Sequence, residues 1–305
     1  MTTTHARSRS TRPNSQLPVA PAPGPDRGTT LGRGATISTL TTAVLALVAT
    51  AAGLLVEDVY TGDAATAAML RGYDLVTLVV ALPLLLLGLV GARRGTLVGL
   101  VLTASLLAYT AYSYAYYVFG TGFNDLFLLH VATLAVASTA LLVVLLGVDP
   151  ERFRSAGTGH VPARTVAGLL GLLTVSLGGM WVYHAVANAV TGDVPVGSAL
   201  VETDLVVHLG MALDLAVLVP LYGVAAVLVW RRTGWGFLLA AVAAVAGVLH
   251  QVGYVVAMPF QVAADVPGAV TQDPFEPVIV AVYLTLVVLL LRGLTRGGMR
   301  PRRDR

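Results

Sequence analysis

The stretch DLVVHLGMALDLAVLVPLYGVAAVLVW, which runs from Asp204 to Trp230, decides the fold of this chain. It is almost entirely apolar, and a bilayer core of ~30 Å needs about 20 such residues to be crossed by a helix. The same stretch carries three ionisable residues, Asp204, His208 and Asp214. Because ionisable side chains are costly at membrane depth, each of them is a functional-site hypothesis. The stretch predicts a transmembrane helix with a polar stripe.

The composition of the chain also indicates a membrane protein. Of its 305 residues, 56% are hydrophobic and 11% are charged, whereas soluble domains have about 25% charged residues. All 19 basic residues are Arg, so a retinal Schiff base, which needs Lys, is excluded. The lack of Cys excludes disulfides, thiolate metal sites and cysteine nucleophiles. Sequence patterns for nucleotide binding and serine hydrolysis are missing as well.

Seven further segments meet or approach the length of a membrane-spanning helix. Together with the opening stretch, the spans are predicted at residues 35–56, 75–92, 96–119, 126–148, 165–187, 205–230, 235–259 and 277–291. Alternating strands, as a membrane barrel requires, do not occur in the sequence. We therefore predict an all-α polytopic membrane helix bundle at residues 35–294. It is flanked by a disordered tail at 1–34 and a basic tail at 295–305.

The distribution of Arg predicts the orientation of the bundle. In an eight-helix arrangement, 18 of the 19 Arg fall on one side, and only Arg71 falls on the other. Cytoplasmic loops carry the excess of basic residues, so both termini are predicted to be cytoplasmic. This placement explains the net charge of +3 without nucleic acid as a partner. The expected main partner is the lipid bilayer.

Four acidic residues lie where helices are expected to start on the outer side. We interpret them mainly as helix caps, because a negative charge is favourable at the positive end of the helix dipole. They are Asp74, Asp125, Asp204 and Glu276. Arg71 is a local ion-pair candidate for Asp74.

An internal repeat would explain several shared features of the second and sixth spans. Each opens with Asp-Leu-Val, contains a proline (Pro83 or Pro220) and closes with Arg-Arg. A duplication of four helices into eight with parallel halves, a common transporter plan, would leave this pattern. Capping and the positive-inside bias would produce most of it without duplication.

Polar side chains on several spans are expected to meet in the outer half of the bilayer. At a rise of ~1.5 Å per residue, Asp214 lies about 15 Å below Asp204, near the midplane. Four of the six His are also intramembrane. The predicted site is an outward-facing polar cavity lined by His130, His184, His208, Asp214, His250 and Tyr254. The alternative is that each His forms local bonds and only holds the bundle together.

Aromatic residues are expected to divide between the helix faces and the membrane interfaces. Tyr109, Tyr112 and Tyr116 share one face of the third span. Tyr114 and Tyr117 are assigned to the outer aromatic belt, together with Trp181, whereas Trp230 and Trp235 are assigned to the inner belt.

Three functions remain open from the sequence. An Asp–His ladder from the surface to the midplane is typical of a proton or cation path in a transporter or channel-like protein. Alternatively, Met180, His184, His208 and Met211 are the ligand candidates of an intramembrane haem, copper or zinc protein, for instance a redox enzyme. The third alternative is a non-catalytic subunit of an envelope complex, as a homo-oligomer or with a membrane partner.

Three stretches carry a resemblance to other proteins. They are RGYDLVTLVVALPLL from Arg71, FNDLFLLH from Phe123 to His130, and the segment from His208 through Asp214 to Pro220. They resemble a group of uncharacterised multi-pass membrane proteins of actinobacteria and related bacteria. The resemblance implies a bacterial inner-membrane location and no particular activity. Members of that group often have Tyr at the position of His130, which argues against His130 as an obligatory ligand.

Overall fold

The computed structural model describes residues 1–2, 30–192 and 198–298 of the chain. The predicted tails at 1–34 and 295–305 therefore lie mostly outside the described residues. The elements, in chain order, are α1 (Arg33–Leu55), α2 (Ala64–Val76), the π-helix η1 (Thr77–Ala81), α3 (Leu82–Arg93), α4 (Leu97–Phe119), α5 (Phe127–Leu146), α6 (Pro150–Gly157), α7 (Ala163–Thr191), α8 (Asp204–Leu213), the π-helix η2 (Asp214–Leu218), α9 (Val219–Trp230), α10 (Gly234–Ala263) and α11 (Glu276–Gly298).

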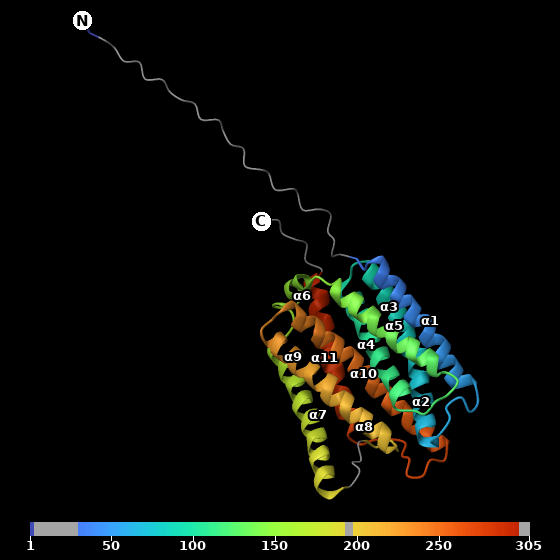
Figure 1. The fold of residues 1–305 in the computed structure, drawn as a ribbon. Helices are drawn as coiled ribbons and strands as arrows, with labels where there is room; N and C mark the ends of the chain where they lie inside the picture. The colour runs from blue at the N-terminus through green and yellow to red at the C-terminus, as the bar shows by residue number, and fades with distance from the viewer. Residues whose placement is uncertain (3–29, 193–197, 299–305) are drawn as a thin grey trace.

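Eight continuous helices in the described part of the chain are long and apolar enough to cross a membrane. Two of them are composite, because α2, η1 and α3 join into Ala64–Arg93, and α8, η2 and α9 join into Asp204–Trp230. Helix α1 begins and helix α11 ends at the same end of the bundle (Figure 1). The predicted all-α bundle of eight spans is confirmed. We call the end where α2, α5, α8 and α11 begin the outer end.

The second span begins eleven residues earlier than predicted, at Ala64 instead of Leu75. Asp63 caps it, because its side chain accepts a hydrogen bond from the backbone N–H of Thr66 at 2.8 Å. The interpretation of Asp74 as a helix cap is wrong, since Asp74 lies a full ten residues inside the helix. The alanines that follow Asp63 are strong helix formers, and they extend the span beyond its hydrophobic part.

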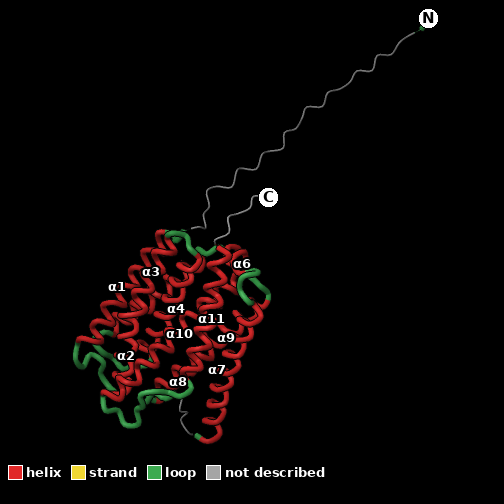
Figure 2. The backbone as a smooth tube through the Cα atoms, turned by 180° about the vertical axis from the view of Figure 1, so that it is seen from behind, coloured by secondary structure: helices red, strands yellow, loops and turns green. Residues whose placement is uncertain are grey.

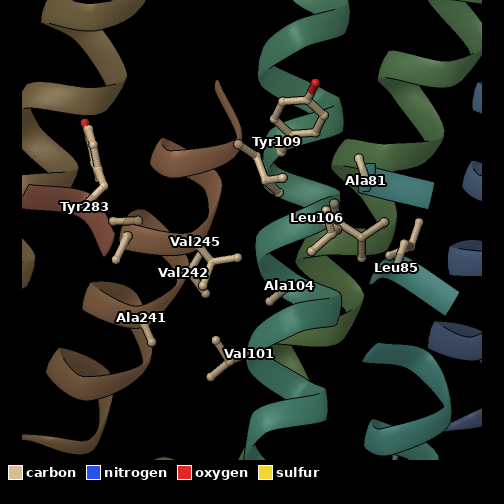
Figure 3. Packing of buried hydrophobic residues seen from close by; sticks show 14 of the residues in the cluster. Ala81, Leu85, Val101, Ala104, Leu106, Tyr109, Ala241, Val242, Val245 and Tyr283 are labelled. Atoms are coloured by element: carbon tan, nitrogen blue, oxygen red, sulfur yellow. The ribbon is translucent and has the colours of Figure 1, made fainter. Parts of the chain in front are cut away.

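Helices α4 and α10 form the centre of the bundle and pack against each other. Small side chains at their contact permit this, among them Val101 and Ala104 of α4 and Ala241 and Val242 of α10 (Figure 3). Helices α3 and α5 pack on α4, whereas α2, α9 and α11 pack on α10. Helix α7 forms one edge of the bundle and α1 the opposite edge (Figures 1 and 2).

Most helix pairs of the first half have a counterpart in the second half, although α7 contacts α11 much less than α1 contacts α5. Within the first half, α1 packs on α5, α3 on α4 and α4 on α5. Within the second half, α7 contacts α11, α9 packs on α10 and α10 on α11. Both composite spans contain a π-helix that is followed by a proline at the start of the next α-helix. The halves therefore correspond at the level of helix pairs and of the broken span.

Proline explains the two π-helices. A proline inside a helix lacks the N–H group for a bond to the carbonyl four residues earlier, and its ring clashes with that carbonyl. For Pro83 this carbonyl belongs to Val79 in η1, and for Pro220 to Ala216 in η2. A widened turn removes the clash. With the prolines aligned, Asp214 corresponds to Thr77, so the shared Asp-Leu-Val does not lie at equivalent positions.

A short amphipathic helix that the sequence did not suggest, α6, lies at the inner end. It buries Phe153 completely and packs on α10 and α11. Arg154 pairs with Glu151 on its exposed side at 2.7 Å, and the Arg152 guanidinium donates to the backbone carbonyl of Gly95 at 2.6 Å. This helix therefore packs against the second half, and Arg152 links it to the loop between α3 and α4.

Candidate functional site

A cavity of about 800 Å³ is lined by side chains of α2, α4, α5, α7, the span α8–η2–α9, α10 and α11. It forms because the two halves pack differently on the central helices. On one side Gly72 of α2 lies against Ala257 of α10, so closely that an added Cβ would sit 2.5 Å from the Cα of Ala257. On the other side the rings of Tyr112 and Tyr116 stand between α4 and α8, which barely touch. Large side chains thus hold open the second interface.

Asp214 is the central polar group of this cavity. The hydroxyl of Tyr112 donates to its Oδ1 at 2.5 Å, and the indole N–H of Trp181 donates to its Oδ2 at 2.8 Å. The hydroxyl of Tyr116 lies 3.4 Å from that of Tyr112. Both carboxyl oxygens therefore have a donor, and both donors are neutral. A carboxylate removed from water is stable only with a proton or a cation as its partner.

His250 lies beside Asp214 and is connected to it through Tyr112. Its ring centroid is 5.1 Å from that of Tyr112 and 5.5 Å from that of Tyr73. Its Nδ1 is buried and has no hydrogen-bond partner in the described chain. Buried ring nitrogens are rarely left unpaired, so His250 brings an unsatisfied polar atom to the wall of the cavity.

Three more carboxyl groups line the outer part of the cavity. Glu202 accepts a hydrogen bond from Ser198 at 2.9 Å, and Asp273 accepts one from Tyr254 at 3.0 Å. Gln251 donates to both oxygens of Glu276, at 3.0 and 3.2 Å. Burial raises the pKa of Glu202, and the charge of Asp214 raises it further, whereas the Ser198 hydroxyl lowers it.

The four carboxyls of the cavity have no basic partner. Within the described chain, no Arg or His nitrogen lies within 4.0 Å of an oxygen of Asp214, Glu202, Asp273 or Glu276. Among the described residues, no Arg lines the cavity, and His250 is the only basic residue there. Such an excess of carboxyls favours positive charge in the cavity, brought by protons or by cations.

A second buried carboxyl, Asp74, lies outside the cavity. The hydroxyl of Tyr60 donates to its Oδ2 at 2.6 Å, and that of Tyr117 to its Oδ1 at 2.9 Å. Burial and the neighbouring Asp74 raise the pKa of Tyr60, which keeps its hydroxyl protonated as a donor. Gly53 makes room for the carboxyl, because an added Cβ would lie only 2.0 Å from Asp74 Oδ2. The predicted ion pair with Arg71 does not form.

Asp74 and Asp214 therefore have closely similar surroundings. Each accepts one hydrogen bond on each oxygen from two aromatic side chains, and one of those donors is a tyrosine of α4. Tyr117, the α4 donor to Asp74, also lines the cavity. It separates the buried carboxyl from the cavity by a single ring.

His130 belongs to the surroundings of Asp74 and does not line the cavity. It is fully buried, and its ring centroid lies 5.0 Å from that of Tyr117 and 5.8 Å from that of Tyr114. Neither ring nitrogen has a hydrogen-bond partner among the described residues. The assignment of Tyr114 and Tyr117 to the outer aromatic belt is wrong, since both are buried against this His.

The other predicted site residues divide between the cavity and the surface of the bundle. Tyr254 lines the cavity and bridges Asp273 to the backbone N–H of Ala199, which donates to its hydroxyl at 2.8 Å. His208 lies on the exposed face of α8. The ring centroid of His184 lies 6.1 Å from that of Trp181 and 5.5 Å from that of Tyr183. Neither of these two His lines the cavity.

The alternative metal ligands are not brought together. Met180 lines the cavity, whereas His184, His208 and Met211 do not. Among the residues that the structure describes, no group of three or more His, Asp or Glu is placed to hold a metal ion. Trp181 was expected at the outer interface, but it is buried and bonded to Asp214. Trp181 is thus one of the two hydrogen-bond donors to the Asp214 carboxyl.

The sequence pointed to Asp214, His250 and Tyr254 but missed the aromatic donors and Asp74. One signal could have revealed Asp74, because Asp63-Ala-Ala-Thr66 before an alanine-rich segment is a helix start. If the second span begins after Asp63, Asp74 lies inside the helix and not at its start. Nothing in the sequence pairs Trp181 with Asp214, because they lie on different helices.

Comparison with known protein families, with curated proteins and with solved structures finds no match to this chain.

Proposed function

We propose that this integral membrane protein is a transporter or channel-like protein whose cavity binds and moves protons or small cations. The observation that supports the proposal is the set of four carboxyls without a basic partner, arranged from the outer loops down to Asp214. Intramembrane carboxyls that face a cavity mark ion or substrate pathways in membrane proteins. The Arg-rich inner end supports a bacterial plasma membrane location with cytoplasmic termini.

The breaks in the sixth span support movement at this site. Asp214 is the first residue of η2, and Pro220 follows the π-helix directly. π-helical turns and prolines are recurrent bending points of helices. A bend at η2 moves Asp214 relative to its donors on α4 and α7, so uptake and release of an ion would be coupled to the shape of the helix.

Two tyrosines on the inner side of Asp214 form the proposed inner gate. The hydroxyls of Tyr222 and Tyr283 lie 2.7 Å apart and are buried. One hydroxyl donates to the other, so the pair closes the polar part of the cavity without charge. An ion that leaves toward the inner end has to separate this pair.

The proposal is tested with the purified protein in liposomes that contain a pH-sensitive dye. A potential, negative inside, is imposed and the influx of protons is measured, followed by that of sodium and potassium with the matching indicators. Asp214→Asn should lower the flux of the transported ion at least ~10-fold, because the amide cannot exchange a proton or balance a cation. Asp204→Asn is the matched control, because Asp204 is exposed at the start of the same span.

Equal flux in the Asp214→Asn and wild-type proteins would contradict the role of this carboxyl. Wild-type liposomes that pass none of the three ions faster than empty liposomes would contradict the proposed function.

A further inference from the structure

The cavity continues beyond the carboxyl groups as an apolar arm that protons and small ions do not need. Toward the inner half it is lined by Leu141 and Leu145 of α5, Leu173 and Leu177 of α7, Leu221 of α9 and Leu239 of α10. Its volume of about 800 Å³ lies in the range of pockets for small organic molecules. Filling such an arm with water is unfavourable, because apolar walls offer water no hydrogen bonds.

The polar end of the cavity selects the charge of an organic ligand. Its four carboxyls disfavour phosphate and carboxylate groups, and the described lining contains no Arg to bind them. A positively charged nitrogen is attracted both by Asp214 and by the aromatic rings beside it. The rings of Tyr73, Tyr112 and Tyr116 surround the edge of the site at His250. Aromatic faces of this kind are favourable partners of substituted ammonium groups.

Helix α7 offers a route for such a molecule from the bilayer. It packs closely on α9 but only lightly on α11, and it stands at the edge of the bundle (Figures 1 and 2). Ser176, Leu177 and Met180 of α7 line the cavity. A small outward movement of α7 would connect the apolar arm to lipid, where amphipathic molecules concentrate.

We infer that the cavity binds an amphipathic organic cation, with its ammonium group at Asp214 and its apolar body in the leucine-lined arm. The inference rests on the proposed cation function and names the substrate class of the same site. It requires two separate recognitions, one of charge and one of apolar length, and each of them can be removed independently.

Binding is measured by equilibrium dialysis of the full-length protein in nanodiscs, with empty nanodiscs subtracted. The main probe is n-octyltrimethylammonium. Tetramethylammonium keeps only its charged head, whereas n-octanol and octanoate keep only its apolar tail. We expect saturable binding of n-octyltrimethylammonium, binding of tetramethylammonium at least ~10-fold weaker, and none of octanoate. If n-octanol or octanoate binds as tightly as n-octyltrimethylammonium, binding depends on the tail alone and the inference is overturned.

Two variants separate the recognition of the head from that of the tail. Asp214→Asn should weaken the binding of n-octyltrimethylammonium at least ~10-fold, whereas the control Asp204→Asn should leave it unchanged. Leu173→Trp fills the arm. It should weaken the binding of n-octyltrimethylammonium by a similar factor and leave the binding of tetramethylammonium unchanged. Because the second variant keeps the carboxyl, a loss of both probes would contradict a separate tail site.

The same experiments distinguish this inference from the proposed function. If Asp214-dependent flux of protons, sodium or potassium is present but n-octyltrimethylammonium does not bind, the ligand class is wrong and the ion path stands. If n-octyltrimethylammonium binds equally to the wild-type and Asp214→Asn proteins, the arm binds apolar molecules only, and the inference is overturned.

Discussion

At the scale of single residues, two carboxyls with aromatic donors distinguish this protein from a simple helix bundle. A structural polar contact in a membrane needs one hydrogen bond across two helices. Asp74 and Asp214 each receive two, one on each oxygen, from tyrosine hydroxyls and an indole N–H. This arrangement holds a carboxyl in a fixed position and leaves its charge to be balanced by a proton or a cation.

The bonds to Asp74 should stabilise the fold measurably. Replacing Tyr117 by Phe removes a donor from a fully buried carboxyl, and leaving such a group unpaired costs about 1–3 kcal/mol. We expect a lower midpoint of thermal unfolding in detergent. The loss should be smaller in an Asp74→Asn background, because a neutral amide is cheaper to leave unpaired. Tyr183→Phe, at a side chain 70% exposed, is the control.

Additive losses in that double-mutant cycle would show that Tyr117 stabilises the bundle without Asp74. The bond of the same hydroxyl to the carbonyl of Leu70, at 3.1 Å, would then be the main contribution.

The stability of the fold should depend on pH through the ionisation of Glu202. Burial first, and then the charge of Asp214, raise the pKa of Glu202 in the fold above its unfolded value of 4.5. The folded state therefore loses stability as the pH rises from 4.5 through this raised pKa. Glu202→Gln removes this penalty and still accepts from Ser198. The variant should unfold at a higher temperature than the wild type at mildly alkaline pH, with the difference vanishing below pH 4.5.

Scanning calorimetry or intrinsic fluorescence at several pH values checks this expectation. A constant difference between the two proteins across the whole range would contradict a contribution from ionised Glu202.

At the scale of elements, the two proline-linked π-helices are the parts of the bundle that can change length and direction. In each, the proline removes one backbone bond and widens the preceding turn. Only the one in the sixth span carries a cavity carboxyl, since its first residue is Asp214. The corresponding residue of the second span is Thr77, which bonds to Tyr109 at 3.1 Å.

Pro220→Ala should therefore affect the site more than Pro83→Ala, the matched control. Without the proline ring, η2 can return to α-helical bonding, which turns Asp214 away from Tyr112 and Trp181. We expect the ion flux to fall several-fold with little change in thermal stability, together with a shift in the fluorescence of Trp181 once Trp230 and Trp235 are replaced by Phe. Equal effects of the two proline variants on flux would contradict a special role for η2.

At the scale of the whole molecule, the bundle is asymmetric although most helix pairs of its two halves correspond. The interface of α2 with α10 is closed by glycine contacts, whereas the interface of α8 with α4 contains the cavity. One of these interfaces is therefore tight and the other is open. The open interface lies beside η2 and Asp214.

The absence of Cys from the chain allows a direct test of its orientation. Ala264→Cys and Asp125→Cys place a thiol at exposed positions of the outer end, and Thr158→Cys places one at the inner end. In intact bacteria, a membrane-impermeant maleimide should label the first two and reach Thr158→Cys only after permeabilisation. Labelling of Thr158→Cys alone in intact cells would reverse the predicted orientation.

The sequence by itself determined the fold class, because the bilayer imposes one simple condition. Each span needs about 20 apolar residues with all backbone groups paired internally, and this requirement is visible locally in a segment such as Asp204–Trp230. The depth of Asp214 follows from the same count. The start of the second span was the exception, since the alanine-rich segment before Asp74 folds as part of the same helix, whereas the span was predicted to begin at Leu75.

Only the tertiary structure decided which polar groups share a site. Helical periodicity fixes the relative directions of residues on one helix, but the rotation of each helix is set by its packing partners. The glycines of α2 and α10 let one interface close, and the tyrosines of α4 hold the other open. That difference brings Trp181 and Tyr112 to Asp214, leaves His208 on the outside, and turns Asp74 from an expected helix cap into a buried carboxyl.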